Sequence, residues 1–219
     1  MAVVALAPAF VVVLAGGTSR RLGGVDKTAL DVGGRPVLVR LLDDLAGLPL
    51  VVVGPRQDVG RDVLWTREDP PLGGPLAATA AGVATGLSEH PDARVVVLVA
   101  GDQPFAGTAV ASLRTALGPD VDAALGAGPD GRPQPLLAAY RLAAVRERLV
   151  GDTHGRPVRD LVRGLRTVTV PVAPGTALDV DDAADLETAR RLARQDPARR
   201  PRTADRPTLP LSPPQGPAR

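Results

Sequence analysis

The chain has 219 residues, of which 44% are hydrophobic and only 2% aromatic, so we expect one domain with a core of Val, Leu and Ala. It contains no cysteine, which excludes disulfides, thiolate metal sites and cysteine nucleophiles. The formal net charge is +2, and residues 196–219 hold five arginines and two aspartates, which leaves about −1 for residues 1–195. A folded part without a basic stripe argues against a nucleic-acid partner.

The two ends of the chain differ in character. The start, MAVVALAPAF, is apolar but lacks the basic region of a secretory signal, and no apolar run reaches the roughly 18 residues of a membrane span. We therefore expect a cytoplasmic protein with no membrane partner. Residues 196–219 contain seven prolines, so we expect one domain, 1–195, followed by a disordered Pro/Arg-rich tail, 196–219.

Strand and helix patterns alternate along the chain. Residues 10–16, FVVVLAG, form a continuous apolar run that is typical of a strand buried on both faces. Helices are expected at 36–47 and 75–87, which both begin with proline, and the alanine-rich second one should pack closely on the sheet. The other expected strands are 50–54, 62–66, 94–102, 121–126, 135–140 and 167–172, and the other expected helices are 107–117, 141–149, 157–165 and 182–194. This order predicts an α/β fold, a three-layer α/β/α sandwich with a mostly parallel sheet.

Three polar segments directly follow predicted strands. They are LAGGTSRRLGGVDK at 14–27, EDPPLGGPL at 68–76 and AGDQPF at 100–105. In such sheets, ligands bind beyond the carboxyl ends of the strands. We therefore expect these three segments to form one binding site.

The chemistry of the three segments suits a nucleoside triphosphate. Glycines let backbone N–H groups approach phosphate oxygens, and Arg21 and Lys27 supply positive charge. Asp102 lies at the end of a buried strand, where a carboxylate can hold Mg²⁺. The glycine spacing fits neither a Walker A loop nor a dinucleotide-binding fingerprint.

The motif L-A-G-G-x-x-R-R-L-G-G-x-D-K resembles the signature of nucleotidyltransferases of the sugar-nucleotide type. Its doubled glycine and Asp-Lys ending resemble the molybdenum cofactor guanylyltransferases in particular. Four further blocks agree in order over about residues 9–194: E-D-x-x-x-G-G-P-L (68–76), G-D-Q-P-F (101–105), P-Q-P-L (133–136) and L-D-V-D-D-A-A-D-L (178–186). The resemblance implies a Rossmann-like nucleotidyltransferase fold and transfer of GMP from GTP to the terminal phosphate of molybdopterin, with release of pyrophosphate. It also implies Mg²⁺ as cofactor, GTP and molybdopterin or molybdenum cofactor as substrates, and acceptor molybdoenzymes or their chaperones as partners.

The resemblance further implies the residues of the site. Arg21, Lys27 and Asp102 would be catalytic, and Asp102 and Asp179 would hold the metal, with Asp181 as the alternative to Asp179. The nucleotide would be bound by Leu14, Ala15, Gly16, Gly17, Arg21, Lys27, Gly54, Asp69, Gly74, Pro75, Leu76 and Asp102.

Several alternatives stay open at this stage. Gly54 stands where the family has Asn, so its backbone groups are expected to replace that contact. Asp181 or Asp182 is instead expected to cap the helix that follows. The enzyme could also use CTP on molybdopterin, or a nucleoside triphosphate on another phosphorylated small molecule. A nucleotide-binding regulatory module that has no catalytic activity is the alternative function outside the enzyme class.

Overall fold

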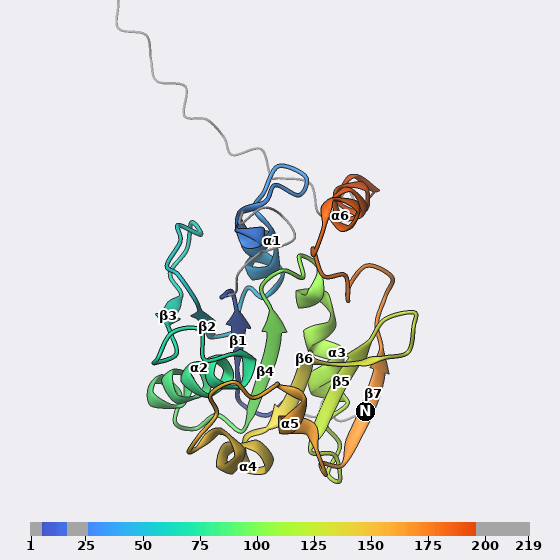
Figure 1. Cartoon of the computed structure of the whole chain (residues 1–219). Helices are drawn as coiled ribbons and strands as arrows, with labels where there is room; N and C mark the ends of the chain where they lie inside the picture. Colours follow the sequence, from blue (N-terminus) through green and yellow to red (C-terminus); the bar gives the residue numbers. More distant parts are fainter. Residues whose placement is uncertain (1–5, 17–25, 196–219) are drawn as a thin grey trace, which may run out of the picture.

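The computed structural model describes residues 6–16 and 26–195, and this part of the chain contains one seven-stranded sheet (Figure 1). The strands are β1 (Ala9–Leu14), β2 (Leu50–Val53), β3 (Leu64–Thr66), β4 (Val95–Ala100), β5 (Ala123–Ala127), β6 (Pro133–Arg141) and β7 (Thr167–Pro171). Their order in the sheet is β3-β2-β1-β4-β6-β5-β7. Only β6 pairs antiparallel with its neighbours among these strands, so the predicted mostly parallel sheet is confirmed.

The expected helices are also present, although several are shorter than predicted. The helices are α1 (Val37–Asp44), α2 (Pro75–Glu89), α3 (Val110–Thr115), α4 (Leu142–Val145), α5 (Arg159–Val162) and α6 (Ala183–Gln195), and the 3₁₀ turns are η2 (Lys27–Ala29), η3 (Ala106–Ala109) and η4 (Arg146–Leu149). The helix predicted over 157–165 keeps only α5, because Gly164 adopts a φ of +72° and reverses the chain before β7. Among the described residues, no helix combines the length and the apolar character that a membrane span needs.

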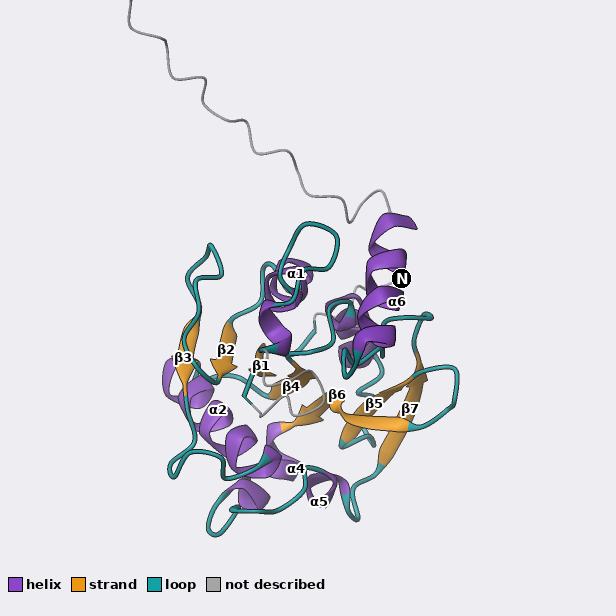
Figure 2. Cartoon of the chain, turned by 45° about the horizontal axis from the view of Figure 1, so that its top comes forward, coloured by secondary structure: helices purple, strands orange, loops and turns teal. Residues whose placement is uncertain are grey.

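Strand β1 forms the centre of the core and is buried on both faces. Val11 and Val13 pack in a cluster with α1 and α3, whereas Phe10 and Val12 pack in a second cluster with α2 and α4. All four side chains are fully buried. Figure 2 shows α1 and α2 on opposite sides of β1, so the three-layer arrangement and the two-sided burial of this strand are confirmed.

Helix α2 lies unusually close to the sheet, as its small residues predict. A Cβ atom added to Gly86 would lie 2.2 Å from Phe10 Cε2, and one added to Gly82 would lie 2.4 Å from Val12 Cγ1. Both glycines therefore let the helix approach β1 at a distance that no other residue permits.

A third, smaller cluster attaches α6 to the body of the domain. Ala189 and Ala193 of α6 pack with Phe105 and Val180, and the Val180 N–H donates to the backbone carbonyl of Asp102 at 3.0 Å. The segment before α6 is thereby held across the carboxyl end of β4. This contact is what brings two distant parts of the sequence into one site.

The start of α6 answers one question that the sequence left open. Asp182 Oδ1 accepts hydrogen bonds from the N–H groups of Ala184 and Asp185, and Asp185 Oδ2 accepts from those of Asp181 and Asp182. This reciprocal arrangement is a capping box. The expected cap is confirmed, and Asp182 is the residue that forms it.

Candidate active site

The segment that follows β1 begins between two glycines that directly follow the neighbouring strands β2 and β4. Ala15 donates its N–H to Val53 at 2.8 Å, and the Gly101 N–H donates to Leu14 at 2.8 Å. A Cβ atom added to Gly54 would lie 2.8 Å from Ala15 C, and one added to Gly101 would lie 2.9 Å from Ala15 Cα. The two glycines therefore let the start of the segment 14–27, here called the signature loop, run close to the chain segments on both sides.

Gly54 has a further role within the sheet. Its φ is +152°, and its N–H donates to the carbonyl of Thr66 at 3.0 Å. The N–H group that the sequence suggested as a replacement for the family's Asn is therefore already used. A contact from Gly54 to a nucleotide would have to come from its carbonyl group or its Cα.

Lys27 begins a short turn whose backbone is firmly held. Asp26 caps η2 by accepting from the Thr28 N–H at 2.9 Å and from Thr28 Oγ1 at 2.6 Å. Gln57, from the loop after β2, donates from Nε2 to Asp26 Oδ2 at 3.0 Å and to Thr28 Oγ1 at 2.8 Å. The end of the signature loop is thus attached to the neighbouring loop by side-chain hydrogen bonds on both sides of Lys27.

The ammonium group of Lys27 lies between two carboxylates. Lys27 Nζ donates a hydrogen bond to Asp181 Oδ1 and lies 3.9 Å from Asp102 Oδ2. The side chains of Lys27 and Asp102 are only 18% and 28% exposed. Burial raises the pKa of Asp102, and the charge of Lys27 partly offsets that effect. The site therefore concentrates charge in a poorly solvated place, which is typical of functional sites.

Asp179 lies in the same group of charges. Burial, followed by the negative charge of Asp102, raises the pKa of Asp179 to about 6, while a hydrogen bond from Gln103 acts in the opposite direction. Asp102 and Asp179 therefore repel each other through a medium of low polarity, an arrangement that a divalent cation would relieve. No group of three His, Cys, Asp or Glu side chains in residues 6–16 and 26–195 is arranged to hold a metal ion.

The block at 68–76 connects β3 to the start of α2. Asp69 is exposed and Gly74 and Pro75 begin α2, whereas the Leu76 side chain is buried in the core. The Leu76 N–H donates to the carbonyl of Arg156 at 3.4 Å. Leu76 can therefore influence a nucleotide mainly by fixing the residues before it.

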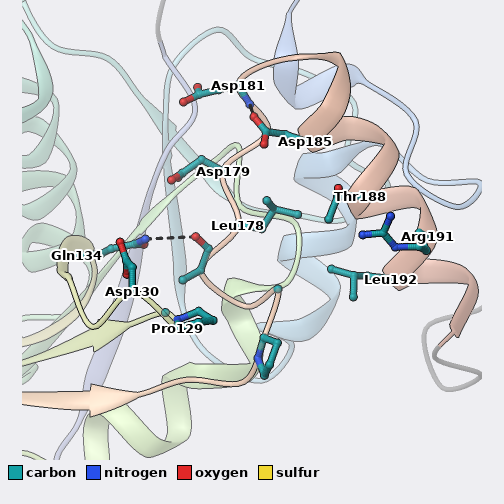
Figure 3. A pocket seen from close by; sticks show the side chains of 14 residues that line it. Pro129, Asp130, Gln134, Leu178, Asp179, Asp181, Asp185, Thr188, Arg191 and Leu192 are labelled. Carbon is teal, nitrogen blue, oxygen red and sulfur yellow. Dashed lines mark hydrogen bonds between the residues drawn. The ribbon is translucent and has the colours of Figure 1, made fainter.

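A pocket of about 660 Å³ adjoins the acidic group, which we define as Asp102, Asp179 and Asp181 (Figure 3). Its walls come from the β5–β6 turn with Asp130, from the segment that carries Asp179 and Asp181, and from α6 with Thr188 and Arg191. Figure 3 shows that α6 and the turn face each other across this space. The pocket can thus take a sizeable polar molecule next to Asp179.

The structure brings together several residues that the sequence singled out and adds two that it did not. Lys27, Asp102 and Asp181 are in contact, and Asp179 is electrostatically coupled to them. Gly17 and Arg21 lie outside the described residues. Sequence reasoning missed Gln57 and Gln103 as members of the site. For Gln103 a signal existed, because it is a polar residue directly after Asp102, at the point where the chain leaves β4 and enters the expected ligand site.

Comparison with known proteins gives consistent results. Residues 11–168 match the model of the MobA-like NTP transferase domain. A molybdenum cofactor guanylyltransferase from Bradyrhizobium sp. (strain ORS 278) is 32% identical over 82% of this chain and 91% of its own length. One from Rhodopseudomonas palustris (strain BisB5) is 31% identical over 84% and 94%. The fold resembles that of molybdopterin-guanine dinucleotide biosynthesis protein A from Archaeoglobus fulgidus, with a TM-score of 0.65 at 21% identity over 85% of this chain and 99% of that one.

Proposed function

The chain belongs to the MobA-like NTP transferase domain family, and we propose that it transfers GMP from GTP to the terminal phosphate of molybdopterin or molybdenum cofactor. An oxygen of that phosphate attacks the α-phosphorus of GTP, the bond between the α-phosphorus and the bridging oxygen to the β-phosphate breaks, and pyrophosphate leaves. The products are the guanine dinucleotide form of the cofactor and pyrophosphate. The observation that carries the proposal is the position of Lys27 between Asp102 and Asp181 at the carboxyl edge of the sheet, in a chain whose relatives are guanylyltransferases by name.

The residues at this edge suit a reaction between two anions. A phosphate monoester is already deprotonated near neutral pH, so the attacking group needs no general base. The obstacle is instead the repulsion between the acceptor phosphate and the triphosphate, which positive charge and N–H donors reduce. Lys27 supplies such a charge, and Gly16, which is exposed and has no side chain, is a place where phosphate groups can approach the backbone.

Asp102 and Asp179 are the residues that we assign to Mg²⁺. Their carboxylates are hard oxygen ligands, and the raised pKa values of both groups reflect burial together with nearby negative charge. Two protein ligands would suit Mg²⁺, which usually keeps several water or phosphate oxygens as its other ligands. When bound, Mg²⁺ withdraws electron density from the phosphate groups and neutralises their charge.

The pocket beside Asp179 offers space for the acceptor molecule. Its volume of about 660 Å³ falls in the range of pockets for small ligands. Asp130, Gln134 and Arg191 provide polar groups around it. Binding there would bring the acceptor phosphate towards the acidic group, where positioning contributes much of the rate enhancement. Recipient molybdoenzymes or their chaperones, and a cytoplasmic location, remain part of the proposal.

One experiment tests the proposal directly. The purified protein is incubated with molybdopterin, Mg²⁺ and each of GTP, CTP, ATP and UTP, and the product is identified by mass spectrometry alongside an assay for pyrophosphate. We expect a guanine dinucleotide product and stoichiometric pyrophosphate with GTP. A cytosine dinucleotide as the main product would replace GTP by CTP as the substrate, and the absence of pyrophosphate with every nucleotide would refute transferase activity on this acceptor.

A further inference from the structure

Gln103 is a buried amide that contacts the acidic group at Asp179. It follows Asp102 in the chain, and only 2% of its surface is exposed. Its Nε2 donates one hydrogen bond to Asp179 Oδ1 at 2.9 Å and a second to Gln134 Oε1 at 2.7 Å. Its Oε1 is buried and has no hydrogen-bond partner among the described residues.

The orientation of this amide follows from the groups around it. Gln134 donates from its own Nε2 to the carbonyl of Ala177 at 3.2 Å, so Gln134 Oε1 is the atom that faces Gln103. If the Gln103 amide were turned round, its oxygen would face this acceptor and the carboxylate of Asp179. The hydrogen bonds therefore run in one direction, and Gln103 must act as the donor.

The oxygen of the same amide is evidence that Gln103 serves through its donor. A buried acceptor without a partner lowers stability, and a methionine of similar length would fill this place without such an atom. A residue that carries an unfavourable atom in the core is expected where its other atom performs a function. The function that the contacts indicate is to hold the Asp179 carboxylate.

Gln103 and Lys27 have different effects on the charge of the aspartates that they bind. Lys27 is a cation, so its ion pair with Asp181 compensates the charge of that residue. Gln103 is neutral, so it fixes Asp179 in place and leaves the full negative charge available to a cation. The Val180 N–H, which donates to the Asp102 carbonyl at 3.0 Å, ties the same two segments together a second time.

We propose that Gln103 is a positioning residue, which holds Asp179 beside Asp102 so that the two carboxylates take up one divalent cation together. The inference rests on the proposed function, because it assumes the metal role of these two aspartates. Groups that orient metal ligands typically change metal affinity or activity by about 10- to 100-fold when they are removed. Gln103 acts on the metal only through Asp179.

The test compares Gln103→Met and Gln103→Glu with a matched control in the full-length protein. Binding of Mn²⁺ alone is followed by electron paramagnetic resonance of the free ion, and the melting temperature is measured without metal. Thr176→Val is the control, since it also removes a buried polar group from the segment before Asp179. The Thr176 hydroxyl lies 3.3 Å from Thr108 Oγ1, and no hydrogen bond joins it to the acidic group.

We expect Gln103→Met to weaken Mn²⁺ binding about 10- to 100-fold. The melting temperature should fall by only a few degrees, because Asp179 and Gln134 lose their donor while the unpaired amide oxygen is removed as well. Gln103→Glu removes the same donor but adds a negative charge that itself favours a cation, so its Mn²⁺ affinity should lie between those of Gln103→Met and the wild type. Thr176→Val should retain wild-type Mn²⁺ affinity.

Three results would overturn the inference. They are unchanged Mn²⁺ affinity in both Gln103 variants, an equal loss in Thr176→Val, and a wild-type protein that does not bind Mn²⁺. Failure of the proposed function looks different. In that case the wild type binds Mn²⁺ and loses affinity on substitution of Gln103, but it releases no pyrophosphate from any nucleotide with molybdopterin.

Discussion

Replacement of Lys27 by arginine should impair catalysis although the positive charge is kept. Lys27 is the only lysine among 26 Lys and Arg residues, so this chain uses arginine almost everywhere that a basic side chain is needed. Lysine presents a compact ammonium group, whereas arginine presents a wide planar guanidinium. We expect the position between Asp102 and Asp181 to accept the first and to displace the second.

The structure sets the size of the effect. The backbone at Lys27 cannot move back to make space, because Asp26 caps the turn and Gln57 holds both Asp26 and Thr28. The Lys27 side chain is only 18% exposed, and its ammonium already lies 3.9 Å from Asp102 Oδ2. We therefore expect the larger group to extend towards the place where the proposed site holds the phosphates, and a displacement of a reacting group by about 1 Å can lower the rate ~10²-fold. This factor corresponds to about 2.7 kcal/mol of transition-state stabilisation.

Steady-state pyrophosphate release with GTP and molybdopterin measures this effect. Lys27→Met is the companion variant, because it removes the charge and should be at least as impaired as Lys27→Arg. Arg166→Lys is the control, since Arg166 pairs with Asp122 at the amino ends of β7 and β5, away from the site at the carboxyl ends of the strands. The melting temperature of Lys27→Arg should stay within about 2 °C of the wild type, because a guanidinium can also pair with Asp181.

An independent measurement uses the fact that the lysine is unique. Selective isotope labelling of lysine gives a single side-chain signal in NMR spectra, and we expect this signal to shift when GTP is added. Wild-type kcat and KM for GTP in Lys27→Arg would refute the argument from shape. A lysine signal that does not respond to GTP would refute contact between Lys27 and the nucleotide.

Three further substitutions test the site, the core and the electrostatics. Asp102→Ala should lower turnover by at least ~10²-fold without loss of melting temperature, because burial already disfavours the charged carboxylate; retention of half the activity would remove Asp102 from the mechanism. Gly86→Ala should lower the free energy of unfolding, measured by urea titration, by about 1–2 kcal/mol. The reason is that the clash of the added methyl group with the Phe10 ring outweighs the gain in helix propensity. An equally stable variant would contradict this. Arg166 holds the pKa of Asp122 at about 2 through its side-chain hydrogen bonds, so in Arg166→Leu this pKa should return towards 3.8. The stability that Asp122 contributes is complete above about pH 4 and is lost as the pH falls towards 2. The difference in free energy of unfolding between wild type and variant should therefore shrink over that range. A difference that does not change with pH would count against the pair of Asp122 and Arg166.

Much of the fold could be predicted from the sequence because the relevant signals are local. The continuous apolar run at 10–16 gave a strand buried on both faces, and the proline at position 75 marked the start of α2. Small residues in α2 predicted its close approach to the sheet, which Gly86 makes possible. Short helices such as α5 were predicted too long, because one glycine with positive φ ends them and composition does not show where such a glycine is used.

The contacts of the site were harder to predict, because they join residues that are far apart in the sequence. Lys27 and Asp181 are separated by 154 positions, and Gln103 and Asp179 by 76. A motif identifies residue types at fixed spacing, but it does not say which carboxylate each donor selects. That choice depends on the packing of α6, which carries the preceding segment across the end of β4.

The four aspartates in residues 178–186 show how environment separates identical residue types. Asp182 and Asp185 accept hydrogen bonds from backbone N–H groups at the start of α6, which is a structural task. Asp181 is paired with Lys27. Asp179 is buried beside other carboxylates and is held by a neutral amide, so among these four residues it combines a fixed position with a charge that no direct ion pair neutralises. A cation is the ligand that such a group favours, and this is why Asp179 is the stronger candidate for a metal ligand than its neighbour two residues later.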